Sequence, residues 1–323
     1  MSAAITGYSL KSYGEMILDK LRLEAYLAAM EKVIKPGDVV LDIGAGPAIL
    51  SMLAVRMGAR KVIAVECNPS IRLGKRLIQI NDLSKTVQCI QGLSTELTLE
   101  SPADVIIADL RGVLPFFSQN IPSIIDARER LLAPGGTLIG CKDTLFSAPV
   151  EHPEEYRRVE EPWRINQFGL DLTAAAEFEI NRWSKVNLRP TQLLADGRNW
   201  ETLDYRTVTQ PSAHGRLSWE IQRVGRLHGI ATWFDAELAP GAKISNHPNE
   251  PELIYGQAFM PVPRAIDVQP GFHLDAQIHA HWVKQHYVWQ WKGQIRDQTG
   301  TLIDKFDQSS VGKTLSNRDL SNG

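Results

Sequence analysis

The chain has 323 residues, which is enough for about two domains of roughly 150 residues each. Its formal net charge of −2 lacks the basic excess that nucleic acids and anionic membrane surfaces attract, so we expect neither partner. The three cysteines, Cys67, Cys89 and Cys141, are far apart and indicate no disulfide framework or paired-cysteine metal site, and with no export signal or long apolar run they favour a reducing, cytoplasmic setting.

From about residue 23 to 142, short apolar runs alternate with helical patterns, which predicts β-α-β units around a parallel sheet. The expected strands are Val39–Ile43, Lys61–Glu66, Asp104–Ala108 and, after a turn at Ala133–Gly136, Thr137–Cys141. The expected helices are Ile49–Met57, Ile121–Leu132 and one that begins with Asn68 as N-cap and Pro69 as first helical residue. This half is expected to be a doubly wound α/β domain.

After about Thr144 the pattern changes to short runs of alternating polarity, which is typical of half-buried antiparallel strands in a barrel or sandwich. The clearest runs are Arg216–Ile221, Ile230–Leu238, Asp275–Val283 and Tyr287–Ile295. A helical segment, Leu170–Phe178, interrupts them early. We therefore expect domains at 1–143 and 144–306 and a polar tail at 307–323.

The stretch Leu41–Leu50 places a strand ending in Asp42 before Gly44, Gly46 and a helix, so flexible backbone and free N–H groups can approach a polar ligand. Glu66 ends the next strand, where a carboxylate can accept both hydroxyls of a ribose. A dinucleotide fingerprint needs a third glycine where Ile49 stands. The pattern therefore favours a nucleoside ligand without a pyrophosphate, of which S-adenosylmethionine is the common one.

With these motifs, the sequence resembles the protein arginine methyltransferase family. The family's opening Met-x-x-Asp-x-x-Arg element matches Met16, Asp19 and Arg22, and the match continues collinearly from about Tyr13 to Phe259. The resemblance implies a class I, Rossmann-like methyltransferase domain followed by an antiparallel β-barrel. It also implies a helical dimerisation arm at about 166–195 and a homodimer formed head to tail.

The resemblance also assigns cofactor contacts. Arg22 is expected to pair with the methionine carboxylate, and Gly44 and Gly46 to pass under the same end of the cofactor. Met16 is expected near the sulfonium, Glu66 at the ribose, Cys67 as a packing residue against the adenine edge, and Ser94 and Thr95 beside the adenine. Tyr13 and Asp42 are also expected to bind the cofactor. Plain core packing is the competing interpretation for Met16.

The acceptor side departs from the family. The two glutamates that clamp the substrate guanidinium fall on Asp109 and Ser118, Arg111 replaces a methionine, and the family's Thr-His-Trp loop falls on Leu253, Ile254 and Tyr255. One carboxylate remains, and a desolvated guanidinium needs paired acceptors. We expect Asp109 to orient or deprotonate the acceptor, Tyr255 or Tyr13 to assist, and Arg111 either to repel a cation or to recognise an acidic acceptor.

Three functions remain open. The first is a methyltransferase for a small molecule or peptide, acting at nitrogen or oxygen; the others are a true protein arginine N-methyltransferase with a rebuilt site, and a cofactor-binding scaffold without turnover. No metal site is expected. His279 and His281 share one face of a strand, but solvent-facing alternation explains them without a metal.

Overall fold

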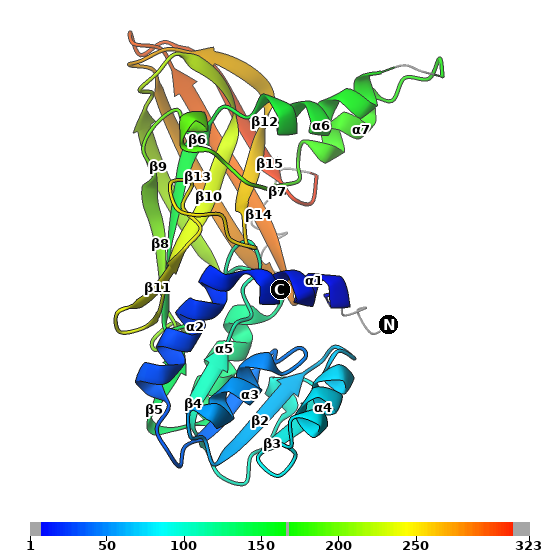
Figure 1. Ribbon diagram of the computed structural model, residues 1–323. Coiled ribbons are helices and arrows are strands. Elements are labelled where there is room, and N and C mark those ends of the chain that lie inside the picture. The colour runs from blue at the N-terminus through cyan, green and yellow to red at the C-terminus, as the bar shows by residue number, and fades with distance from the viewer. Residues whose placement is uncertain (1–7, 166–167, 313–323) are drawn as a thin grey trace.

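The computed structural model describes residues 8–165 and 168–312. The N-terminal domain is built on a parallel sheet in the order β3-β2-β1-β4-β5 (Figure 1). The strands are β1 (Val39–Ile43), β2 (Lys61–Glu66), β3 (Val87–Gln91), β4 (Ala103–Ala108) and β5 (Leu132–Ile139). The helices that cover it are α3 (Ile49–Arg56), α4 (Ile71–Ile80) and α5 (Asn120–Arg130), and a short 3-10 turn, Ser94–Glu96, follows β3.

The strand order places the predicted site residues together. All five residues of β1 are buried, as expected of a strand covered on both faces. The order reverses between β1 and β4, which both leave their carboxyl ends at the same edge of the sheet. Ligands of open α/β sheets bind at such a switch point. Asp42 and the glycine loop follow from β1 there, and Asp109 follows directly after β4.

Two helices, α1 (Leu10–Leu18) and α2 (Lys20–Val33), connect the domains (Figure 1). Asp19 lies between them and caps α2 by accepting the backbone N–H of Arg22 at 3.0 Å. Its other oxygen accepts the backbone N–H of Ile254 at 2.7 Å, so the cap also ties the helices to a loop of the second domain. The helices in the described ranges are all too short or too polar to cross a bilayer.

The second domain consists of two antiparallel sheets. One joins β7 (Ser184–Val186), β12 (Gln257–Val268), β10 (Gly225–Ala239), β6 (Lys142–Val150) and β8 (Arg198–Asp204), with β11 (Ala242–Ser245) on β10. The other joins β15 (Leu302–Ser309), β14 (His286–Arg296), β13 (His273–Val283) and β9 (Ala213–Glu220). A helical arm of α6 (Pro153–Arg164) and α7 (Thr173–Glu179) projects from this domain (Figure 1).

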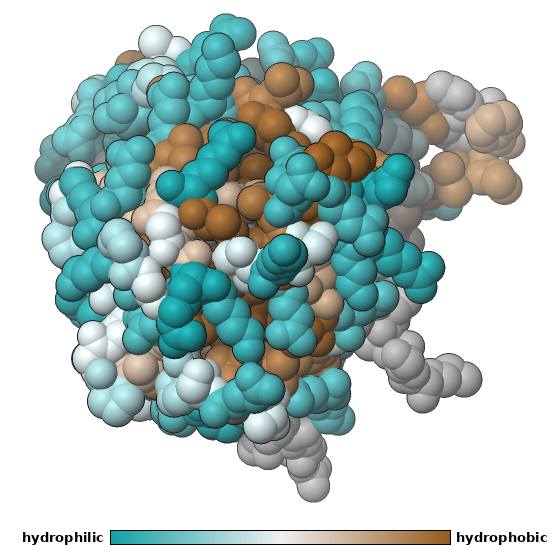
Figure 2. All heavy atoms as spheres, turned by 60° about the horizontal axis from the view of Figure 1, so that its bottom comes forward, coloured by the Kyte–Doolittle hydropathy of each residue, from teal (hydrophilic) through white to brown (hydrophobic). Residues whose placement is uncertain are grey.

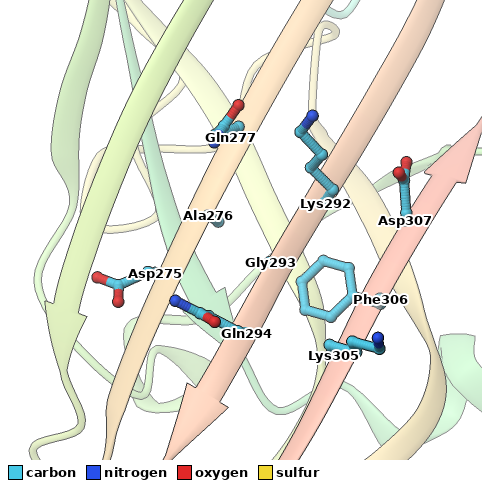
Figure 3. A pocket seen from close by; sticks show the side chains of 9 residues that line it. All are labelled: Asp275, Ala276, Gln277, Lys292, Gly293, Gln294, Lys305, Phe306 and Asp307. Atoms are coloured by element: carbon cyan, nitrogen blue, oxygen red, sulfur yellow. The ribbon is translucent and has the colours of Figure 1, made fainter. Parts of the chain in front are cut away.

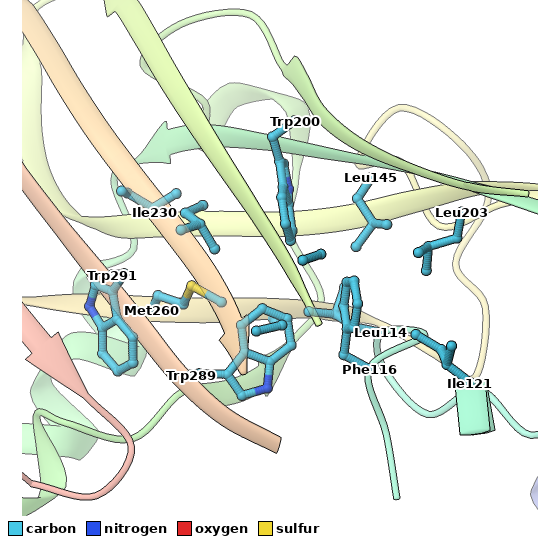
Figure 4. Close-up of a cluster of buried hydrophobic side chains, with 14 of the residues drawn as sticks. Leu114, Phe116, Ile121, Leu145, Trp200, Leu203, Ile230, Met260, Trp289 and Trp291 are labelled. Carbon is cyan, nitrogen blue, oxygen red and sulfur yellow. The ribbon is translucent and has the colours of Figure 1, made fainter. Parts of the chain in front are cut away.

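One hydrophobic cluster crosses the boundary between the domains. Leu114, Phe116 and Ile121 follow β4, yet they pack among the barrel residues Trp200, Leu203 and Trp289 (Figure 4). Phe116 meets three aromatic rings of the barrel, with ring centroids 5.5 to 6.0 Å away. The segment after β4 is therefore held by the barrel as well as by its own domain.

Several boundaries differ from the sequence prediction. The N-cap of α4 is Ser70, because Asn68 instead accepts the backbone N–H of Ser70 at 2.9 Å in a turn before the helix. The glycines at 135 and 136 lie inside β5, whose pairing with β4 shifts register there. Strand β6 begins at Lys142, and β15 runs to Ser309, into the predicted tail. Helix α6 was not predicted. The rest of the tail, 313–323, and arm residues 166–167 lie outside the described residues.

Candidate active site

The loop after β1 is shaped for close approach of a ligand. Gly44 and Gly46 have φ of +71° and +53°, a region in which glycine carries no steric penalty. A Cβ on Gly44 would come within 2.2 Å of Leu110, and one on Gly46 within 2.5 Å of the Tyr13 ring. The loop therefore requires glycine at both positions, and α1 covers it through Tyr13.

Glu66 braces this loop. Its carboxylate accepts the backbone N–H of Gly46 at 2.9 Å and that of Asn68 at 2.7 Å, and the side chain is buried. Cys67 donates its thiol to the same carboxylate at 3.4 Å. Burial, together with the Glu66 charge, raises the pKa of Cys67 to about 11, which disfavours its thiolate form.

The other predicted cofactor residues line the same end of the sheet. Asp42 accepts the Ser51 hydroxyl at 2.5 Å, and burial raises its pKa to about 7. The Ser70 hydroxyl donates to Tyr13 at 3.1 Å, and burial raises the pKa of Tyr13 to about 12.

The adenine side is held by an arginine from α5. Ser94 is buried and Thr95 exposed, and both follow β3 in the 3-10 turn. Arg130 donates to the carbonyl oxygens of Ser94 and Thr95 at 3.2 and 3.1 Å. The predicted pair therefore lies on a braced turn at the carboxyl end of β3.

Asp109 and Tyr255 were both predicted to contact the acceptor. They are 146 positions apart in the sequence but are in direct contact in the fold. The Tyr255 hydroxyl donates to Asp109 Oδ1 at 3.0 Å, and Arg22 forms an ion pair with Asp109 Oδ2. Arg22 also donates to Tyr255 at 3.1 Å and to the Met16 carbonyl at 3.2 Å. Arg22, expected at the cofactor carboxylate, thus bridges the cofactor and acceptor sides.

Arg111 lies differently from the expectation that it faces the acceptor as a free cation. It is buried, because its guanidinium forms a bidentate contact with Asp143 at 3.2 and 3.4 Å and donates to the Tyr26 hydroxyl at 2.6 Å. It also lies 3.6 Å from Asp109 Oδ1. Its charge is therefore paired inside the protein, and Arg111 lies against Asp109 as a buried partner and not as a free cation.

These charges decide the protonation of the two carboxylates. Burial opposes the ionisation of Asp109, but Arg22 and Arg111 outweigh it and lower its pKa. Burial raises the pKa of Asp143, and Arg111 and the Tyr205 hydroxyl, which donates at 2.6 Å, oppose that rise. Asp109 is accordingly an anion, and a weak base.

The sequence prediction missed part of this cluster. Tyr26, Asp143 and Tyr205 come from α2, β6 and the turn after β8, and only the packed fold brings them to Arg111. Tyr8 was also missed. Burial and the nearby Asp109 charge raise the pKa of its phenol, and Arg22 opposes this rise. Its ring stacks on Phe117, with the ring centroids 6.4 Å apart.

Ser118, at the position of the family's second glutamate, has a φ of +46° and is exposed. The described side chains that contact Asp109 include Arg22, Arg111, Tyr26 and Tyr255, and none of these is a carboxylate. Of the two positions at which the family has glutamates, only Asp109 therefore carries a carboxylate.

A hollow of about 560 Å³ lies elsewhere, on the four-stranded sheet of the barrel (Figure 3). Asp275, Asp307, Lys292 and Lys305 line it, so its charges balance. Nearby, His214, His279 and His281 stack with ring centroids 5.9 and 5.1 Å apart. Within residues 8–165 and 168–312 no group of three or more metal-binding side chains is arranged to hold an ion.

Comparisons with known proteins were made for both sequence and fold. The model of the family described as "Ribosomal protein L11 methyltransferase (PrmA)" matches residues 24–141. The chain is 28% identical to the probable protein arginine N-methyltransferase 6 of Arabidopsis thaliana, over 76% of this chain and 58% of that protein. It is also 28% identical to protein arginine N-methyltransferase 6 of Xenopus tropicalis, over 82% of each chain. The match thus spans little more than half the length of the Arabidopsis relative.

Solved structures match the fold. The Arabidopsis thaliana protein arginine methyltransferase 10, in a conformation described as uniquely open, aligns with a TM-score of 0.81 at 22% identity, over 93% of this chain and 97% of that one. A Trypanosoma brucei enzyme–prozyme heterotetrameric complex with AdoHcy aligns with a TM-score of 0.83 at 21% identity, over 92% and 96%. The solved structures confirm the predicted fold class, a Rossmann-like domain followed by an antiparallel barrel, and the curated relatives confirm the predicted resemblance to the protein arginine methyltransferases.

Proposed function

This chain is a divergent relative of the protein arginine methyltransferases, and we propose that it transfers a methyl group to an acceptor other than a protein arginine. The observation that carries the proposal is the state of Asp109, which is already paired with Arg22 and with Arg111. A guanidinium that leaves water needs carboxylate acceptors that are not already paired with another cation. Ser118 supplies none.

The residues of the crevice fit the cofactor. Leu110 and Tyr13 pack directly on the backbone of the glycine loop, and Glu66 ends β2 beside it. Arg22 donates three of its five N–H groups to Tyr255, Met16 and Asp109, which leaves two for a carboxylate. We assign the ribose to Glu66 and the methionine carboxylate to Arg22.

When bound, S-adenosylmethionine supplies an electrophilic methyl group. The chain's own contribution is then to place the acceptor atom in line with that methyl group and to exclude water. Asp109 and Tyr255 lie at the carboxyl end of β4, where they can accept and donate hydrogen bonds to the acceptor. The barrel holds this segment in place through Phe116.

Labelled methyl transfer tests the proposal. Purified protein is incubated with S-adenosylmethionine carrying a tritiated methyl group and with three acceptor pools: arginine-rich peptides, a metabolite extract and a peptide extract. We expect label in a small molecule or peptide at a nitrogen or oxygen outside guanidinium groups. Label confined to arginine side chains would contradict the proposal. Cofactor binding without product in any pool would support a scaffold without turnover.

Protein arginine N-methylation is the second candidate. It is supported by the similarity to named arginine methyltransferases over 76% to 82% of this chain and by the carboxylate retained at Asp109. It requires Asp109 to leave Arg22 or Arg111 when the substrate enters. The same labelling experiment separates the two candidates, because the labelled atom differs.

A homodimer through the arm is part of the proposal. The arm exposes large apolar side chains, namely Ile165, Phe168, Leu170, Leu172 and Phe178. The N-terminal domain offers a groove of about 220 Å³ between α3 and the turn after α4. Its lining is mostly apolar, with Ile49, Met52, Leu53 and Leu83 beside Arg56 and Asn81. Figure 2 shows hydrophobic residues on the domain face and on the projecting arm. An apolar projection and an apolar groove on one chain suit a closed, symmetric pair.

A further inference from the structure

Four buried charges meet at the acceptor side. Arg22 and Arg111 are cations, Asp109 and Asp143 are anions, and their side chains are between 0% and 12% exposed. The set is neutral in sum. Asp143, through a bidentate contact, and the Tyr26 hydroxyl hold the Arg111 guanidinium in place. In this position the guanidinium lies 3.6 Å from Asp109.

We infer that Arg111 is a specificity-determining positioning residue: held by Asp143, it neutralises Asp109 from within the protein, so that the site selects an uncharged hydroxyl acceptor over a guanidinium or ammonium group. The inference deepens the proposed function and rests on it. A like charge close to an incoming cation costs free energy in a site shielded from water, whereas a neutral hydroxyl meets no such cost.

The hydroxyl assignment follows from what Asp109 and Tyr255 offer. An ionised carboxylate accepts a hydrogen bond from a hydroxyl, and the Tyr255 hydroxyl lies beside it at 3.0 Å. In the transfer, a lone pair of the acceptor oxygen forms the bond to the methyl carbon, and the carbon–sulfur bond breaks with its electron pair going to sulfur. The methylated oxygen then still carries its proton as an oxonium, which is acidic enough to transfer that proton to the weak base Asp109, and Asp109 passes it to water.

The test measures binding and so is independent of turnover. Protein saturated with S-adenosylhomocysteine is titrated, by NMR, with a guanidinium probe, N-acetylarginine methylamide, and a hydroxyl probe, N-acetyltyrosine methylamide. Three proteins are compared: the wild type, the double variant Arg111→Met with Asp143→Asn, and Arg111→Lys. The double variant removes one cation and one anion, so no buried charge is left alone, and methionine keeps the length of the arginine stem. Lysine keeps the charge but not the fork.

The double variant is expected to bind the guanidinium probe at least about tenfold more tightly than the wild type does, because Asp109 then keeps Arg22 alone as a cationic partner and no Arg111 cation lies beside it to oppose the probe. The lysine variant is expected to retain the wild-type preference for the hydroxyl probe, which a purely structural role of Arg111 would not produce. A change below about twofold in the double variant, or a lysine variant that matches it, would overturn the inference.

The wild type alone gives a second measurement should a variant fail to fold. It must bind the hydroxyl probe more tightly than the guanidinium probe, and the reverse order would overturn the inference. A calorimetric titration with S-adenosylmethionine is run in parallel. Loss of cofactor binding there would count against the proposed function, whereas the probe ratio counts only for or against the role of Arg111.

Discussion

At the scale of the single residue, the Glu66 carboxylate has two roles. It lies at the end of β2, where we assign the ribose, and it accepts two backbone N–H groups of neighbouring loops. Glu66→Gln keeps the size of the side chain but removes its charge and half of its acceptors. We expect S-adenosylmethionine to bind about tenfold or more weakly, as for the loss of charged hydrogen bonds. Calorimetry measures this, with the exposed Glu96→Gln as control. Unchanged affinity would remove the ribose assignment.

Asp109→Asn tests the acceptor side. Asparagine still offers one oxygen to Arg22 and Tyr255, so we expect cofactor affinity to change by less than about threefold. Turnover should fall by about a hundredfold or more, because the amide can neither accept the acceptor's proton nor attract its hydroxyl as an anion does. The initial rate of S-adenosylhomocysteine formation measures the effect. A variant as active as the wild type would show that Asp109 has no chemical role in the transfer.

At the scale of the element, two histidines of β13, His279 and His281, give a pH dependence of stability. Burial lowers the pKa of His279 to about 4 and also lowers that of His281. The neighbouring groups His214 and Lys292 lower the pKa of His279 further, whereas the Asp307 carboxylate raises it. A histidine whose folded pKa is depressed binds more protons when unfolded, so stability is lost as pH falls below about 6.5.

His279→Gln should therefore flatten this loss. Between pH 7.5 and 5 the wild type should lose of the order of 1 kcal/mol more of its free energy of unfolding than the variant, after a discount for partial exposure. Urea unfolding at each pH measures the difference, and comparison with the variant cancels the opposite contribution of buried Asp42. Parallel pH profiles would show that His279 is not titrating in this range.

The elements of the N-terminal domain could be predicted because their signals are local. Buried parallel strands produce apolar runs, so β1 and β2 were predicted at their exact bounds. Helix α6 was missed because its exposed, charged sequence contains Pro162. Asp109 and Tyr255 were found through family motifs, whereas Asp143 and Tyr205 carry no motif. Their role depends on a buried contact with Arg111 that no spacing in the sequence encodes.

At the scale of the whole molecule, the exposed apolar side chains of the arm lead us to expect a homodimer. Phe178 is 68% exposed on α7. Phe178→Asp would place a charge in the proposed interface, and we expect it to shift the protein from dimer to monomer at micromolar concentration. Light scattering measures the mass. Val224→Asp is the matched control, because this valine is 71% exposed but lies on the barrel, between β9 and β10. A monomeric wild type, or a dimeric Phe178→Asp variant, would contradict the arm assignment.

The account as a whole joins a retained cofactor crevice to an acceptor site whose single carboxylate is neutralised from within. Its most direct test is the position of the transferred methyl group, mapped by mass spectrometry after incubation of the protein with deuterated S-adenosylmethionine and cell extract. We predict a product methylated on an uncharged hydroxyl. A product methylated on the guanidinium of protein arginine would contradict the central claim.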